Sequence, residues 1–172
     1  MELTQEQRER YARHFVLSDI GEEGQKRLLA AKVLVLGAGA LGSASLMYLA
    51  SAGIGTIGIV DGDNVELSNL HRQVIHKNEN VGKPKAVSAA ERIHEINPDV
   101  HVEIYHRFAT TEDICELIEP YDFIVDAVDT FATKLLVSDA CVLMKKPFVH
   151  AGIVRFGGQA MTYVPGQGPC LR

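Results

Sequence analysis

The stretch KVLVLGAGALGSASLMYLASAGIGTIGIVD, residues 32–61, contains in order a strand, a glycine turn, a helix, a second strand and a carboxylate. Residues 32–36 are apolar and rich in β-branched side chains, which is typical of a strand buried on both faces. Leucines then recur at helical spacing up to Gly53, a suitable helix end. Residues 56–60 predict another strand, which ends at Asp61. The stretch therefore predicts a βαβ unit within a parallel sheet.

A glycine pattern, G-x-G-x-x-G, lies between the first strand and the helix at Gly37, Gly39 and Gly42. The first glycine permits a tight turn, the second lets a ligand approach the backbone, and the third lets the helix pack on the sheet. Asp61 stands where a nucleotide-binding βαβ unit needs a carboxylate for the ribose hydroxyls. A glycine turn without a ligand would have the same pattern, but this order of strand, helix and carboxylate favours a nucleotide site. The identity of the nucleotide stays open.

A membrane-spanning segment is another interpretation, because residues 33–60 carry no charge and are long enough to cross a bilayer. Glycine and serine residues interrupt this run, and its pieces match two strands and a helix. We therefore expect a protein without a membrane-spanning segment here.

The composition is that of one globular domain over residues 1–172, with 47% hydrophobic and 23% charged residues. The net charge of −5 argues against nonspecific binding to nucleic acid or to an anionic membrane, so any anion site requires a local cluster of cations. The charged N-terminal segment MELTQEQRERYARHF predicts a protein without a secretory signal, located in the cytoplasm. An odd number of cysteines, with Cys115 and Cys141 in helical patterns, predicts reduced thiols.

An N-terminal helical extension is expected over residues 1–31, ahead of the core at residues 32–172. Thr4 can cap a helix that runs to about Phe15, with Gln7 as its partner in a capping box. A second helix is expected near residues 24–31. Arg13 lies on a basic helix face, where a solvated surface charge is the simplest interpretation.

A long polar segment, GDNVELSNLHRQVIHKNENVGKPK, follows Asp61. Ordered loops of this length are usually functional. We expect the next helix at residues 83–96, with Pro84 in its first turn. Cations in a first turn oppose the helix dipole, at a cost of about 0.3–1 kcal/mol each. A bound phosphate would resolve this conflict at Lys83 and Lys85, and exposure of both side chains to water is the alternative.

The remaining sequence alternates strands and helices, so the predicted fold is α/β: a Rossmann-like, doubly wound and mainly parallel sheet with helices on both faces. Asp126 and Asp129 follow a predicted strand, at the edge where ligands gather, and either metal binding or capping of the helix near Thr130 is open. Cys170 begins an incomplete C-x-x-C pattern, so this chain alone predicts no zinc site. The expected strands lie at residues 100–105, 122–126, 147–151 and 157–164, and the expected helices at 111–118 and 133–144.

With these residues assembled, the chain resembles the ThiF/MoeB/HesA family, the bacterial relatives of ubiquitin-activating enzymes. The resemblance spans nearly the whole length, and several motifs in one order are far more specific than a single glycine turn. These motifs are R-Y-x-R at residues 10–13, G-x-G-x-x-G at 37–42, D-x-D at 61–63, S-N-L-x-R-Q at 68–73, G-K-P-K at 82–85, I-N-P at 96–98, D-x-x-D at 126–129 and G-G-Q at 157–159.

The resemblance implies an adenylyltransferase that joins the α-phosphate of ATP to the C-terminal carboxylate of a small ubiquitin-like sulfur carrier ending in Gly-Gly, in thiamine or molybdopterin biosynthesis. By matching position, Asp61 would hold the ribose, Asp129 would bind Mg²⁺, and Arg13 would reach the β- and γ-phosphates from the second subunit of a homodimer. The triphosphate would be held by Asn69, Arg72, Gln73 and Lys85, of which Arg72 and Lys85 would act in catalysis with Arg13 and Asp129. The other implied nucleotide contacts are Gly37, Gly39, Ala40, Gly42, Asp63, Ser68, Leu70, His71 and Thr130.

The sequence departs from the family pattern at Ala40, His71 and Thr130, where glycine, glutamine and asparagine are frequent, and we expect altered contacts with the chemistry retained. Family members continue past Cys170 into a second pair of zinc-binding cysteines. The core therefore looks incomplete at its C-terminus, and Zn²⁺ is expected only in a chain that continues past Arg172. An NAD-dependent oxidoreductase and a non-catalytic nucleotide-binding dimer module are the alternative functions.

Overall fold

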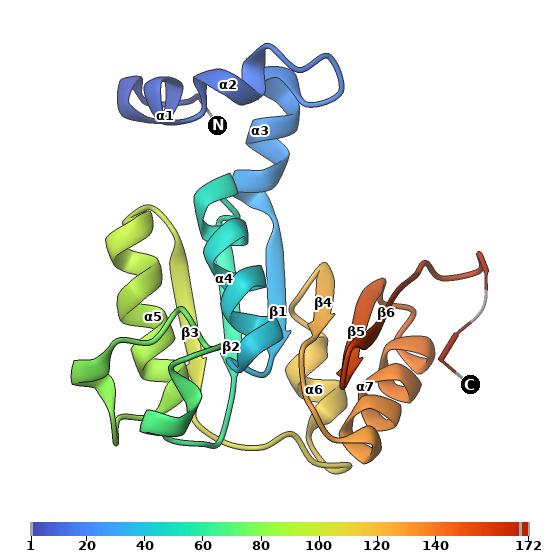
Figure 1. Cartoon of the computed structure of the whole chain (residues 1–172). Coiled ribbons are helices and arrows are strands. Elements are labelled where there is room, and N and C mark those ends of the chain that lie inside the picture. The colour runs from blue at the N-terminus through green and yellow to red at the C-terminus, as the bar shows by residue number, and fades with distance from the viewer. Residues whose placement is uncertain (1, 169, 172) are drawn as a thin grey trace.

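The computed structural model describes residues 2–168 and 170–171, which fold around a six-stranded sheet of order β3-β2-β1-β4-β5-β6 (Figure 1). The predicted domain begins at Met1 and ends at Arg172, and these two residues lie outside the described part of the chain. Strands β1 to β5 run parallel, and β6 is antiparallel to β5. The strands are β1 (Lys32–Leu36), β2 (Thr56–Val60), β3 (His101–Tyr105), β4 (Phe123–Asp126), β5 (Phe148–Val154) and β6 (Gly157–Tyr163). The predicted Rossmann-like, mainly parallel fold is confirmed.

Helices cover both faces of this sheet (Figure 1). Successive residues of β1 point to opposite faces, so that Val33 and Val35 pack with α4 and α5, whereas Leu34 and Leu36 pack with α6 and α7. Each of these side chains is at most 4% exposed, and burial stabilises the fold by roughly 1.5–3 kcal/mol for each aliphatic side chain. The four helices around the described sheet are α4 (Ala40–Ala52), α5 (Lys85–Ile96), α6 (Ile114–Ile118) and α7 (Phe131–Leu143).

Short helices α1 (Gln5–Arg10), α2 (Ala12–Phe15) and α3 (Gly21–Ala30) form an arm beyond the end of the sheet where the strands begin (Figure 1). The predicted capping box of Thr4 and Gln7 is present. The prediction of one continuous helix to Phe15 is wrong, because the chain bends at Tyr11. The Tyr11 ring is only 2% exposed, and its hydroxyl accepts a hydrogen bond of 2.9 Å from Asn97 Nδ2. This long-range contact favours the bend over continued helix.

The polar segment between β2 and α5 is ordered around two 3₁₀ turns, η1 (Leu67–Asn69) and η2 (Asn78–Asn80). α5 begins at Lys85 with Pro84 as its N-cap residue, so the prediction that Lys83 lies in the helix is wrong. Pro84 has ψ 132°, an extended value outside the helix, and its ring disfavours helical geometry for Lys83 before it. Lys83 pairs with Glu91 at 2.8 Å and Lys85 with Asp63 at 2.9 Å. Carboxylates of the chain itself therefore balance both cations, and Lys85 is buried, so the alternative of exposure to water is wrong for Lys85.

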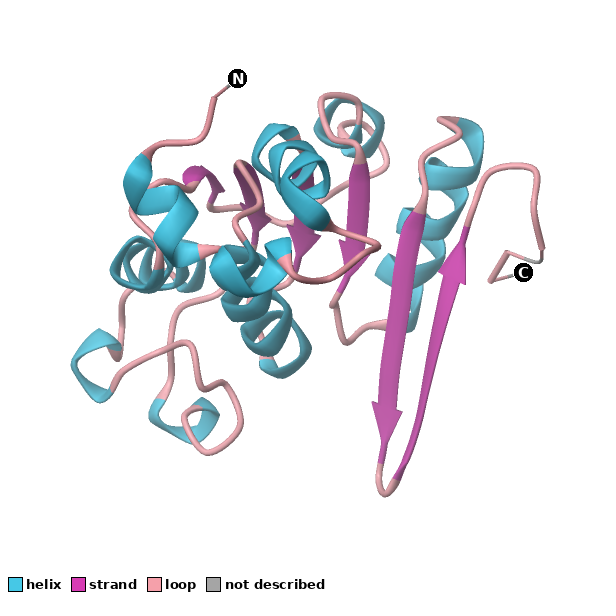
Figure 2. Ribbon diagram, turned by 90° about the horizontal axis from the view of Figure 1, so that it is seen from above, coloured by secondary structure: helices cyan, strands magenta, loops and turns pink. Residues whose placement is uncertain are grey.

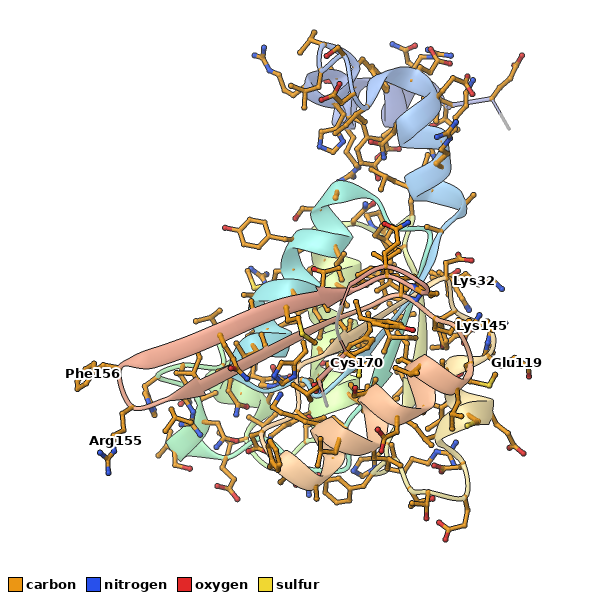
Figure 3. All side chains as sticks on the ribbon, turned by 90° about the vertical axis from the view of Figure 1, so that its right-hand side faces the viewer. Lys32, Glu119, Lys145, Arg155, Phe156 and Cys170 are labelled. Carbon is orange, nitrogen blue, oxygen red and sulfur yellow. The ribbon has the colours of Figure 1, made fainter. Side chains whose placement is uncertain are left out.

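β5 continues three residues beyond its predicted end at Ala151, and with β6 it forms a long hairpin that projects from the body of the molecule (Figure 2). Arg155 and Phe156 lie at the tip of this hairpin (Figure 3). The extension is possible because β5 and β6 pair along their whole length, from Phe148 with Tyr163 to Val154 with Gly157. Near the tip, pairing of the two backbones holds the hairpin where the sheet offers no other support.

Cys141 is fully buried in α7 and Cys115 is half-buried in α6, and neither forms a disulfide. Burial raises the pKa of the Cys141 thiol to about 12, so this group stays protonated at neutral pH. The structure therefore contains both residues as free thiols within helices. Among the helices of the described residues, none is both long enough and apolar enough to span a membrane.

Candidate functional site

A cavity of about 1010 Å³ opens at the carboxyl ends of the parallel strands. Its walls come from the glycine turn after β1, the loops that follow β2, β3 and β4, the first turns of α5 and α7, and the inner face of the β5–β6 hairpin. This is the position at which open α/β sheets bind their ligands. Among the residues predicted for the site, the cavity wall includes Gly37, Gly39, Ala40, Asp61, Asp63, Arg72, Gln73, Lys85, Asp129 and Thr130.

The glycine turn has a separate physical reason for each glycine. Gly37 has φ 95°, in the left-handed region, and a side chain there would meet the Ala127 carbonyl at 2.7 Å. A side chain on Gly42 would collide with the Gly37 carbonyl, so this glycine lets α4 pack closely on the turn. At Gly39 a β-carbon would meet only Gln73 Nε2, at 3.7 Å. The Gly39 backbone therefore faces the cavity, and α4 begins there without a side-chain cap, as an anion-binding helix start requires.

Asp61 is held rigidly at the end of β2. Its Oδ2 accepts a hydrogen bond of 2.8 Å from the Ala38 amide, and its Oδ1 accepts one of 2.9 Å from the Asp63 amide. The carboxylate is 9% exposed and lies on the cavity wall. It therefore presents its remaining lone pairs in a fixed direction, which suits hydrogen bonds from ligand hydroxyl groups.

Cationic and amide groups line the cavity beside the glycine turn. The Lys85 ammonium donates to Asp63 Oδ2 at 2.9 Å, and Arg72 Nη1 donates to the Ser68 carbonyl at 3.0 Å. Gln73 is only 5% exposed, and within the described residues its Oε1 has no hydrogen-bond partner. A buried amide oxygen costs about 1–3 kcal/mol when unpaired, so the site favours a ligand or a water that supplies a donor.

The second half of the cavity contains a buried ionic cluster at the end of β4. Asp126 accepts a hydrogen bond of 2.7 Å from His150 Nδ1 and forms an ion pair of 3.4 Å with Lys134. Lys134 also donates to the Ala151 carbonyl at 2.7 Å, and Gln159 Nε2 lies 3.3 Å from His150 Nε2. Asp126 is thus committed to side chains of α7 and β5. Asp129, by contrast, is exposed and lines the cavity.

Sequence reasoning missed Lys134 and His150 as members of this cavity wall. The register of β4 and β5 pairs Asp126 with His150. Lys134 lies in the first turns of α7, which place it beside the same aspartate. The available signals were a histidine inside an apolar strand and a lysine inside the apolar helix FATKLLVSDACVL. Arg107 and Phe108, which follow β3, also line the cavity and were not predicted.

Several predicted residues lie away from the cavity wall. Asn69 is buried, and its Oδ1 accepts a hydrogen bond of 3.2 Å from the Glu66 amide, which stabilises the turn before Arg72. Arg13 is exposed on α2, beyond the opposite end of the sheet (Figure 1). Cys170 packs at the edge of the core formed with α6 and α7. The other predicted residues outside the lining are Gly42, Ser68, Leu70 and His71.

The donor set of the cavity fits a polyphosphate better than a resident metal cluster. Within residues 2–168 and 170–171, no group of three or more histidine, cysteine, aspartate or glutamate side chains could hold a metal ion. The exposed Asp129 carboxylate on the cavity wall offers an oxygen ligand for Mg²⁺. In proteins, Mg²⁺ commonly takes one or two carboxylates and completes its shell with phosphate oxygens and water. A magnesium ion that arrives with a polyphosphate is therefore compatible with these residues.

The fold, the glycine turn and the cavity at the strand ends define a Rossmann-like domain of the nucleotide-binding type. The chain belongs to the ThiF family, which matches residues 11–172.

Proteins of similar sequence include two that are named as adenylyltransferases. The chain is 47% identical to the sulfur carrier protein adenylyltransferase of Thermus thermophilus, over 100% of this chain and 65% of that protein. It is 50% identical to the probable adenylyltransferase/sulfurtransferase MoeZ of Mycobacterium tuberculosis, over 94% of this chain and 41% of MoeZ. The chain thus spans about two fifths to two thirds of these relatives' lengths.

A solved structure has the same fold. The crystal structure of E. coli tRNA N6-threonylcarbamoyladenosine dehydratase, TcdA, in complex with ATP superposes with a TM-score of 0.81 at 28% identity. The match covers 88% of this chain and 68% of the TcdA chain.

Proposed function

We propose that this chain is the adenylylating domain of an enzyme that activates a small ubiquitin-like sulfur carrier with ATP. One observation carries the proposal: Arg72, Gln73, Lys85 and Asp129, distant in sequence, line one cavity beside the glycine turn of a ThiF-family chain. Its relatives support the substrate class, since the Thermus thermophilus protein is named for adenylylation of a sulfur carrier.

In the proposed reaction, a carboxylate oxygen of the carrier's terminal glycine attacks the α-phosphorus of ATP. A new O–P bond forms, the bond from the α-phosphorus to the bridging oxygen breaks, and pyrophosphate leaves with the electron pair. No general base is required, because the attacking carboxylate is already ionised. The enzyme's task is to position both reactants and to stabilise the negative charge that grows on pyrophosphate.

We assign each group a role that its position in the cavity supports. Asp61 accepts hydrogen bonds from the ribose hydroxyls, and the first amides of α4 face the phosphates. Arg72 and Lys85 balance the charge of the departing pyrophosphate, which Lys85 does by exchanging its Asp63 partner for phosphate oxygens. Asp129 would hold Mg²⁺, which when bound neutralises phosphate charge. Phe108 and Val128 provide apolar surface in the same cavity for the adenine ring.

We also propose a homodimer in which Arg13 of one subunit completes the site of the other. The arm that carries α2 lies beyond the end of the sheet opposite the cavity, so Arg13 is remote from the cavity of its own chain (Figure 1). A second subunit would bring that arginine to the phosphates. We further propose that the enzyme is cytoplasmic and that its carrier supplies sulfur for the synthesis of thiamine or molybdopterin. Identification of the carrier that co-purifies with the enzyme would show which pathway it serves.

ATP–pyrophosphate exchange that depends on a Gly-Gly carrier tests the proposed reaction. We expect exchange with the unsubstituted chain and a loss of about 10²-fold or more in Arg72→Ala and Asp129→Ala, the magnitude typical of removing one group that stabilises transition-state charge. Arg27→Ala is the matched control, because Arg27 is exposed on α3 and does not line the cavity. Exchange that survives both cavity substitutions would refute the assigned roles, and ATP binding without any exchange would indicate a non-catalytic nucleotide-binding module.

A further inference from the structure

His76 lies behind the cavity wall and connects the segments that carry the nucleotide-binding groups. It is 7% exposed and does not line the cavity. Its Nε2 lies 3.0 Å from the Ala38 carbonyl oxygen, and its Nδ1 lies 2.9 Å from the Ser88 hydroxyl. Ser88 is 1% exposed and Ala38 is 0% exposed, so neither contact is open to water.

These distances define the tautomer of the ring. A carbonyl oxygen only accepts, so Nε2 must carry the proton and donate to Ala38. In a neutral imidazole Nδ1 is then the acceptor, and the Ser88 hydroxyl donates to it. Burial has the largest effect and lowers the pKa of His76. The Ala38 hydrogen bond opposes it by a smaller amount, and the still smaller effects of the Lys85 ammonium and the Asp61 carboxylate lower and raise the pKa, respectively. The neutral form with both hydrogen bonds is therefore the form present at neutral pH.

The hydrogen-bond partners of the His76 imidazole belong to the glycine turn and to α5. Ala38 stands between Gly37 and Gly39 in the glycine turn, and its amide is held by Asp61. Ser88 lies one helical turn after Lys85 on α5. The His76 backbone amide bonds to the Gln73 carbonyl at 3.2 Å, in the loop that also carries Arg72. One side chain thus links the glycine turn to α5 through the loop between them.

We propose that His76 is a positioning residue of the nucleotide site, which fixes the glycine-turn amides relative to Lys85, Arg72 and Gln73. The inference rests on the proposed function, because its purpose is to set the spacing of groups around a polyphosphate. Hydrogen bonds hold Ala38 on both sides, because its amide donates to Asp61 and its carbonyl accepts from His76. Loss of the second bond frees the turn to rotate away from the phosphate position.

A pair of amide substitutions separates positioning from simple packing. In His76→Gln the side-chain amide nitrogen reaches the place of Nε2 and can donate to Ala38. In His76→Asn the shorter amide lies near the place of Nδ1, so it contacts Ser88 and leaves the Ala38 carbonyl unpaired. By isothermal titration with Mg·ATP we expect His76→Asn to bind about tenfold more weakly, the order expected for one buried polar group left unpaired, and His76→Gln to stay within about threefold of the parent.

Hydrogen exchange of the Gly39 and Ala40 amides gives a readout that needs no nucleotide. Exchange at these amides should be faster in His76→Asn than in His76→Gln, while exchange in β2 and β3 is unchanged. Equal binding and equal exchange in both variants would overturn the positioning role. If the unsubstituted chain does not bind Mg·ATP, the proposed function fails, and the exchange rates still decide whether His76 holds the turn.

Ser88→Ala provides a second route if His76→Asn does not fold. It removes only the hydroxyl that orients the ring and keeps the Ala38 contact. We expect it to weaken Mg·ATP binding by about threefold and to speed exchange at Gly39 and Ala40, since one neutral hydrogen bond contributes about 1 kcal/mol. Binding and exchange that match the parent would contradict the proposed link to α5.

Discussion

The Asp61 carboxylate uses one oxygen for the Ala38 amide and the other for the Asp63 amide. In Asp61→Asn the side-chain amide has only one oxygen, so one of these backbone donors must face an NH₂ group. We expect the free energy of unfolding in urea to fall by about 1–3 kcal/mol, the cost of leaving a buried donor unpaired. Asp129→Asn is the control, because Asp129 is exposed and should tolerate the change. An Asp61→Asn chain as stable as the parent would contradict this account of the turn.

The buried His76 makes stability depend on pH in a defined direction. Its pKa in the folded chain lies below the ordinary value of 6.5, chiefly because of burial, so below that pH the unfolded chain binds a proton that the folded chain does not. The free energy of unfolding should therefore fall as the pH falls from about 7.5 to 5.5. Urea unfolding at both pH values should show a smaller drop in His76→Gln, which has no imidazole to protonate. An equal drop in both chains would contradict the assignment.

At the scale of elements, a methyl group added at Gly42 should affect mainly stability, whereas one added at Gly39 should affect mainly nucleotide binding. A side chain at Gly42 would collide with the Gly37 carbonyl where α4 packs on the turn, whereas one at Gly39 would point into the cavity. We expect Gly42→Ala to lower the free energy of unfolding by about 1–3 kcal/mol, as overpacking does. Gly39→Ala should keep the stability and weaken nucleotide binding. Thermal unfolding and titration with Mg·ATP measure both effects, and the opposite ranking would refute the assigned roles.

Local patterns predicted the elements whose determinants are local. The strands at residues 32–36 and 56–60 and the helix end at Gly53, which has φ 83°, agree with the sequence because alternation, glycine and burial act within a few residues. The bend at Tyr11 was missed, since it depends on a hydrogen bond to Asn97, far along the chain. Lys134 and His150 were missed for the same reason: strand register and helix placement bring them to Asp126, and neither can be derived from spacing.

At the scale of the whole molecule, the position of the arm makes the proposed dimer testable by complementation. If each site uses its own Arg72 and the partner's arginine from α2, Arg13→Ala and Arg72→Ala should each be impaired in pyrophosphate exchange. Mixing the two variants forms heterodimers in which one site regains both arginines. Random pairing makes about half of the dimers heterodimers, and each heterodimer has one intact site out of two. The exchange activity should therefore recover to about one quarter of the parent's activity. No recovery on mixing, with dimers confirmed by sedimentation, would contradict a shared site.

We propose that the cavity beside the glycine turn binds a magnesium-complexed triphosphate through Arg72 and Lys85. Isothermal titration of the 172-residue chain with ATP and Mg²⁺, and separately with NAD, tests it most directly. We predict saturable ATP binding that Arg72→Ala weakens by at least about tenfold, in line with the loss of a charge-assisted hydrogen bond, and no comparable binding of NAD. Tight binding of NAD with no binding of ATP would contradict the claim.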